Sequence, residues 1–260
     1  MDPTARMPAV FIGHGSPTNA LEHNRYTEAW HEFGTSIPAP RAILAISAHW
    51  YVNATAVTAM ERPRTIHDFY GFPPELFAFD YPAPGDPGLA ERIIDIAAPT
   101  WIGRDLDSWG IDHGTWSVLA HLAPAAEIPV VQLSIDATKS LDEHLELGAR
   151  LAPLRNDGVL ILASGNVVHN LQRIDWSKPE DGFDWAHDFD SAVRQIMAED
   201  PRSLPQVTKK VSFELAVPTP DHFLPLAYLC GVAAADHQTA DVLVGGAAYG
   251  SLTMTSFVLS

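Results

Sequence analysis

Short apolar runs that alternate with helical patterns constrain the fold of this chain more than any other feature. The apolar runs predict strands buried on both faces at residues 8–12, 42–47, 129–134, 158–163 and 242–245. The intervening patterns predict helices at residues 20–33, 87–97, 114–121, 141–154 and 185–198. This alternation predicts one α/β domain over residues 1–260, with a mainly parallel central sheet and helices on both faces.

The composition argues against several classes of partner. A net charge of −16 and the lack of a basic run argue against nucleic-acid binding. The sequence has no apolar stretch long enough to span a membrane and no signal-peptide pattern at its start. The single cysteine, Cys230, lies in an apolar setting and is expected to be buried and reduced. We therefore expect a cytoplasmic protein with no membrane association and no obligate protein partner.

A long irregular segment, residues 60–87, is rich in proline and aromatic residues. Such a segment inside a compact domain is usually a lid or a binding element. Its aromatic side chains either wall an apolar pocket or only pin a surface segment to the core, and the sequence favours neither alternative. If the segment does form a wall, the candidates for substrate contact are His67, Tyr70 and Phe72.

Histidine is unusually frequent, with 12 residues against 16 lysines and arginines together. His14, His49 and His169 each come shortly after a predicted strand. Because the carboxyl ends of parallel strands meet at one edge of a sheet, these three side chains are expected to converge. His113 and His222 lie at predicted helix starts, where the helix dipole disfavours the positive ring and suits a neutral ligand or base.

Neutral imidazole groups are good ligands for zinc and iron(II). The sequence contains no local metal-binding spacing such as HExxH or CxxC, so the ligands would come from distant positions. The residues by themselves therefore predict a histidine metal centre and leave its metal and its ligand number open. His14 and His49 are its two best-supported members.

The segments GHGSP, SAHW, DHGTW, ASGNVVHNL and VPTPDHFLPL resemble, in order and spacing, those of the 4,5-DOPA extradiol dioxygenase-like proteins. These proteins belong to the class III extradiol ring-cleavage dioxygenases. The resemblance extends over nearly the whole chain, including YGFPPELF and GSLTMTSF. It implies one mononuclear divalent metal, Zn²⁺ or Fe²⁺, with a catechol such as DOPA as substrate and O2 as co-substrate.

The resemblance also implies roles for individual residues. His14, His49 and His222 match metal ligands, and His169 matches either a fourth ligand or the catalytic acid/base. His113 matches a second catalytic histidine that would contact substrate or oxygen.

The third ligand is thus a histidine, where many class III enzymes have a carboxylate. This exchange removes a negative charge and favours zinc. Two alternatives stay open, a zinc-dependent hydrolase on the same scaffold and a non-catalytic zinc-binding protein. A serine hydrolase is less favoured, because neither Ser16 nor Ser164 lies in a GxSxG sequence.

Overall fold

The computed structural model describes residues 6–260. The first five residues of the predicted domain, which belong to the start of the chain that was checked for a signal peptide, lie outside the described residues. The strands of the central sheet are β1 (Ala9–Gly13), β2 (Ala42–Val52), β3 (Ala56–Thr58), β5 (Gly103–Asp105), β7 (Val130–Asp136), β8 (Val159–Gly165), β9 (Asp241–Val244) and β12 (Ser256–Leu259). Their order is β5-β3-β7-β2-β8-β1-β12-β9. The four central strands, β7, β2, β8 and β1, are parallel, whereas β12 is antiparallel to both of its neighbours and β3 is antiparallel to β7.

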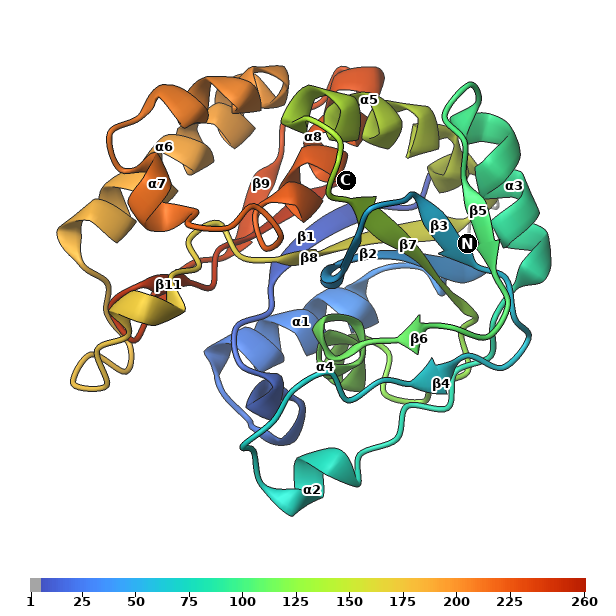
Figure 1. Cartoon of the computed structure of the whole chain (residues 1–260), viewed down its shortest axis with the longest axis horizontal. Coiled ribbons are helices and arrows are strands. Elements are labelled where there is room, and N and C mark those ends of the chain that lie inside the picture. The colour runs from blue at the N-terminus through green and yellow to red at the C-terminus, as the bar shows by residue number, and fades with distance from the viewer. Residues whose placement is uncertain (1–5) are drawn as a thin grey trace.

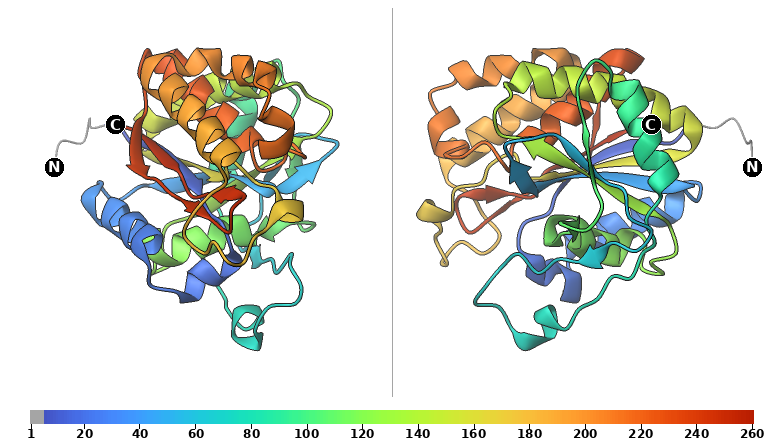
Figure 2. Two further views of the ribbon diagram at one scale, coloured as in Figure 1. Left: turned by 90° about the vertical axis from the view of Figure 1, so that its left-hand side faces the viewer. Right: turned by 45° about the vertical axis from the view of Figure 1, so that its right-hand side comes forward.

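Helices cover both faces of this sheet (Figures 1 and 2). One face carries α3 (Pro87–Ala97), α5 (Leu141–Leu151), α6 (Asp184–Glu199) and α8 (Leu224–Asp236), and the other carries α1 (Arg25–Ser36) and α4 (His113–Leu122). The short elements are α2 (Pro74–Phe77), α7 (Phe213–Ala216), β4 (Arg64–Thr65), β6 (Gly110–Ile111), β10 (Ala247–Ala248), β11 (Leu252–Thr253) and 3-10 turns at Pro17–Leu21, Ala152–Asp157, Leu171–Arg173 and Pro201–Lys209. The predicted fold class is confirmed. Within residues 6–260, each helix is too short or too polar to cross a bilayer.

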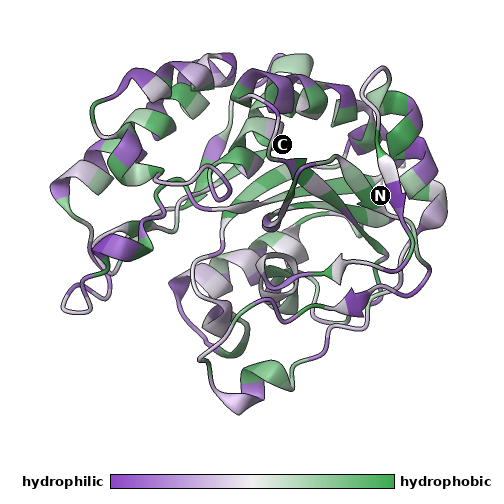
Figure 3. Cartoon of the chain, viewed as in Figure 1, coloured by the Kyte–Doolittle hydropathy of each residue, from purple (hydrophilic) through white to green (hydrophobic). Residues whose placement is uncertain are grey.

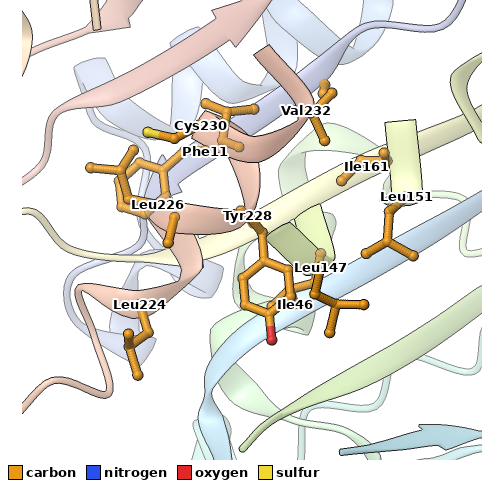
Figure 4. Close-up of a cluster of buried hydrophobic side chains, with 14 of the residues drawn as sticks. Phe11, Ile46, Leu147, Leu151, Ile161, Leu224, Leu226, Tyr228, Cys230 and Val232 are labelled. Carbon is orange, nitrogen blue, oxygen red and sulfur yellow. The ribbon is translucent and has the colours of Figure 1, made fainter. Parts of the chain in front are cut away.

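The two faces of the sheet are packed by two separate apolar clusters, because successive side chains of a strand point to opposite faces. Phe11 of β1 packs with the helices of one face, while its neighbours Val10 and Ile12 pack with the other. Hydrophobic residues accordingly follow the central strands in Figure 3. Figure 4 shows α8 packed against α5 and the sheet, with Cys230 fully buried as predicted.

The structure corrects the prediction for residues 242–245. They were expected to form a strand buried on both faces, but β9 is the last strand of the sheet and Val242 is 44% exposed. An edge strand has a neighbour on one side only, so apolar residues there gain less cover than in the centre.

Two helix boundaries also differ from the prediction. The helix expected from residue 20 begins at Arg25, because Asn24 caps it and Pro17–Leu21 forms a separate 3-10 turn. The helix expected to reach residue 154 ends at Leu151 and continues as a 3-10 turn that contains Pro153.

The segment predicted to be irregular ends at residue 86, because Pro87 begins α3. The segment 60–86 runs along the α4 side of the molecule, and its middle part around α2 projects from the body (Figure 2). Its aromatic residues divide between the two predicted uses. The hydroxyl of the buried Tyr81 donates to the Ala123 carbonyl at 2.6 Å, and Phe79 stacks on Trp116 with ring centroids 5.0 Å apart. These two residues pin the segment to the core, whereas Phe72 lines the cavity described below.

Candidate metal centre

The candidate centre lies at the carboxyl end of the central parallel strands, where the predicted histidines were expected to converge. His14 follows β1 directly, and His169 comes shortly after β8. His49 was expected after its strand, but β2 continues to Val52 and contains this histidine. The register between β2 and β7 shifts between Ile46 and Tyr51, and an irregularity of this kind redirects the side chains that it contains.

The other two histidines lie where helices begin, close to the same strand ends. His113 is the first residue of α4, whose N-cap is Asp112. His222 comes just before α8, and its carbonyl accepts the Asn166 N–H at 2.8 Å. A β-carbon at Gly165 would lie 2.1 Å from this carbonyl oxygen, so only glycine permits the close approach of β8 to the His222 turn.

The structure brings all five histidines together. Ring centroids of His14 and His49 are 5.1 Å apart, and His222 lies 5.3 Å and 5.0 Å from these two rings. His169 stacks on His222 at 3.5 Å. His113 is 3.8 Å from His49, and the ligand atoms of His14, His49 and His113 all lie within 4.8 Å of one another. These three residues could therefore hold a metal ion, and the choice among His113, His169 and His222 as further ligands stays a prediction.

One carboxylate fixes two of these rings. Asp68 lies 3.0 Å from His49 Nδ1 and 2.8 Å from His113 Nδ1, and it also accepts the backbone N–H of His113 at 3.1 Å. Both rings hold the pKa of Asp68 far below its usual range although burial opposes this shift. An ionised carboxylate can only accept hydrogen bonds, so both Nδ1 atoms carry a proton. When such a ring is neutral, its Nε2 carries a free lone pair.

His14 and His222 are held in the same tautomer. The Ser164 hydroxyl donates to the Gly114 carbonyl at 2.5 Å, so it accepts the hydrogen bond from His14 Nδ1 at 3.0 Å. The carboxylate of Asp221 accepts from Nδ1 of His222. Partners of this kind on Nδ1 are typical of metal-binding histidines.

The distance between Nε2 of His14 and Nε2 of His49, 3.2 Å, tests whether a metal fits. Two lone pairs at this distance repel each other unless a proton or a metal ion lies between them. In tetrahedral zinc sites with Zn–N bonds of about 2.0 Å, two ligand nitrogens are about 3.3 Å apart. The spacing of this pair therefore fits a shared metal ion.

Burial and the neighbouring rings keep most of the cluster uncharged. Burial lowers the pKa of His14 well below its ordinary value, and it lowers that of His169 to about 2 and that of His222 to about 4. His49 is also buried, but hydrogen bonding to Asp68 and nearby carboxylates hold its pKa above the ordinary value. Uncharged rings bind a metal without first losing a proton.

Asp112 is the N-cap residue of α4, next to His113 of the cluster. Its side chain is fully buried, and burial raises its pKa. The carboxylate accepts from the Ser47 hydroxyl at 2.7 Å, from the Thr115 N–H at 3.2 Å and from the Gln132 amide. These donors compensate for the loss of water around the carboxylate. The sequence prediction missed both Asp68 and Asp112, although each stands next to a histidine in the sequence, His67 and His113.

All five histidines line a cavity of 830 Å³. Of the predicted substrate contacts, Phe72 lines this cavity. His67 lines a different cavity, with its Nε2 2.8 Å from the Phe79 carbonyl, and Tyr70 projects into solvent with 92% of its surface exposed. The rest of the apolar wall consists of residues that the sequence prediction did not select: Pro17, Leu171, Ile174, Trp176, Tyr249 and Leu252.

Comparisons with known proteins show which family the chain belongs to. The family described as the catalytic LigB subunit of aromatic ring-opening dioxygenase matches residues 8–258. The 4,5-DOPA dioxygenase extradiol of Escherichia coli K12 is 45% identical over 97% of this chain and 94% of its own. The protein of the same name from Beta vulgaris is 38% identical over 95% of this chain and 96% of its own.

A solved structure gives the same result. The crystal structure of an uncharacterized protein from Escherichia coli K12 matches with a TM-score of 0.85 and 41% identity, covering 98% of this chain and 100% of that one. The chain therefore belongs to the family of catalytic LigB subunits of aromatic ring-opening dioxygenases, as the sequence resemblance predicted. It is an enzyme of the extradiol dioxygenase class.

Proposed function

We propose that this enzyme opens the ring of a catechol such as DOPA in a metal-dependent reaction with O2 as co-substrate. The observation that carries the proposal is the cluster of histidines that line a largely apolar cavity, with ligand atoms of His14, His49 and His113 within 4.8 Å of one another. Relatives from Escherichia coli and Beta vulgaris that match nearly the whole chain are named 4,5-DOPA dioxygenase extradiol, which supports this substrate class. A cytoplasmic location, expected from the composition, is part of the proposal.

In this proposal His14, His49 and His222 hold the metal, Fe²⁺ for ring cleavage. When bound, the metal would lower the pKa of a catechol hydroxyl, and iron would supply the redox activity that a reaction with O2 requires. His169 acts as the acid/base or as a fourth ligand. The family membership and the names of these relatives give no support to a zinc hydrolase or a non-catalytic zinc protein.

The proposed proton acceptors are the two remaining neutral rings. Hydrogen bonding to Asp68 keeps the Nδ1 proton of His113 in place, so its Nε2 is the atom that can take a hydroxyl proton. The ring of His169 is neutral and lines the same cavity, so it is the second candidate. Phe72 and Trp176 give the cavity apolar walls, which orient a flat ring and exclude water from it.

The test is to load metal-free protein with iron(II) without oxygen, add DOPA or 4-methylcatechol, and then admit O2. We expect oxygen uptake in a one-to-one ratio with catechol loss and a yellow ring-opened product. The variant His14→Ala should lose the activity. The control His187→Ala changes an exposed histidine of α6 that does not line the cavity, and it should keep the activity. If stoichiometric iron is bound and no catechol consumes oxygen, the proposal is wrong.

A further inference from the structure

The wall of the histidine cavity is uneven in charge. Among the described residues that line it, Glu22 is the one formally charged side chain besides the histidines, and lysine and arginine are absent. A cationic substituent therefore meets the carboxylate of Glu22 in this wall, whereas an anionic substituent meets no lysine or arginine there.

An aromatic pair lines the same cavity as Glu22. The rings of Trp176 and Tyr249 are 5.0 Å apart and inclined at 59°, and Trp176 is 76% exposed. Aromatic faces attract ammonium groups, because the face of the ring carries negative charge density. The pair thus adds a second attraction for a cation.

Glu22 and Tyr249 mark the place where a second cavity, of 470 Å³, adjoins the first, since both residues line both cavities. A volume of 830 Å³ is of the size that holds a drug-sized ligand, so a catechol ring at the histidines leaves room for a substituent directed at this junction. Beyond the junction, the lining of the second cavity includes one charge of each sign, on Arg25 and Glu180. The Arg25 guanidinium donates a hydrogen bond to the Tyr26 hydroxyl at 2.7 Å.

We propose that Glu22, Trp176 and Tyr249 form a subsite for a positively charged substituent of the substrate. The enzyme then selects catechols that carry a protonated amine over catechols that carry a carboxylate alone. This inference rests on the proposed catechol dioxygenase function and names the substrate class within it. A catechol with an amino acid substituent, such as DOPA, also fits the subsite, because its ammonium group can contact Glu22.

The kinetic test compares three catechols of similar size that differ in charge: dopamine, neutral 4-ethylcatechol and anionic 3,4-dihydroxyphenylacetate. With iron-loaded wild-type protein, we expect the lowest KM for dopamine and the highest for the anion. The variant Glu22→Gln should raise the ratio of the dopamine KM to the 4-ethylcatechol KM about two- to fivefold, which is the range for one solvent-exposed ion pair. The control Glu28→Gln removes an exposed charge from α1 outside this cavity and should leave the ratio unchanged.

A binding measurement separates this inference from the proposed activity. Zinc-loaded protein cannot turn the catechols over, so their dissociation constants can be measured by quenching of tryptophan fluorescence. Tighter binding of dopamine than of 4-ethylcatechol, lost in Glu22→Gln, supports the subsite even if no catechol is oxidised. Equal affinity for the amine and the anion in the wild type, or an equal shift for all three ligands in Glu22→Gln, would overturn it.

Discussion

The variant Asp68→Asn tests whether one carboxylate holds two histidines of the centre in the tautomer that leaves Nε2 without a proton. The side chain of Asp68 is 17% exposed, and both of its oxygens accept from a histidine Nδ1. An asparagine offers one acceptor oxygen, and its NH2 group can only donate. The Nδ1 of either His49 or His113 must then face the NH2 group, which moves the ring proton to Nε2. That atom can then neither bind a metal nor accept a proton.

The magnitude follows from the loss of one such partner. Removing a group that orients a metal ligand typically lowers metal affinity about 10- to 100-fold. Asp68 orients the proposed ligand His49 at 3.0 Å, so we expect a loss of zinc affinity in this range, whose upper end corresponds to about 2.7 kcal/mol of binding free energy.

The assay is a titration of metal-free protein with zinc in competition with a chromophoric chelator. Glu75→Gln is the matched control, because it removes an exposed charge from the same segment, in α2. Circular dichroism and thermal unfolding of both variants check that the fold is kept. If Asp68→Asn is folded and binds zinc as tightly as the wild type and Glu75→Gln, the tautomer argument is refuted.

Two further predictions concern stability, both measured by urea unfolding of metal-free protein. Burial lowers the pKa of His144 to about 4. Between this value and the unfolded pKa of about 6.5, the unfolded chain binds a proton that the folded protein does not bind. The folded protein therefore loses up to about 3 kcal/mol of stability as the pH falls from 6.5 towards 4. His144→Gln should therefore weaken the loss of stability between pH 7 and pH 4.5, and an unchanged pH profile would contradict this reasoning. Gly165→Ala should cost about 1–3 kcal/mol, because its β-carbon would meet the His222 carbonyl at 2.1 Å; wild-type stability would show that the turn can move away at little cost.

The parts of the fold that the sequence predicted are those with a strong local signal. Long apolar runs identified β1, β2, β7 and β8 because these central strands are buried on both faces. The strands β3 and β5 have three residues each, too few for a periodic pattern. The exposure of β9 depends on its place at the edge of the sheet, which is a property of the topology and not of its own residues.

The site residues that the sequence predicted are likewise those with a local signal. The five histidines were selected because each comes shortly after a predicted strand or at a predicted helix start, and the fold class brings such positions together. Asp68 was missed because its partner His113 is 45 positions away, and nothing near Asp68 shows where the segment 60–86 will fold. The same lack of local signal left the uses of His67, Tyr70 and Phe72 open, and in the structure they separate into three different surroundings.

The segment 60–86 has a consequence for protein engineering. It supplies an apolar wall residue of the cavity, Phe72, and also the carboxylate that orients two histidines, Asp68. In the proposed function, substrate range and metal binding therefore both depend on this one stretch of chain. A chimera that takes this stretch from another enzyme to accept a new ring will lose metal unless the graft keeps an acid at position 68 and the tyrosine anchor at position 81 that holds it in place.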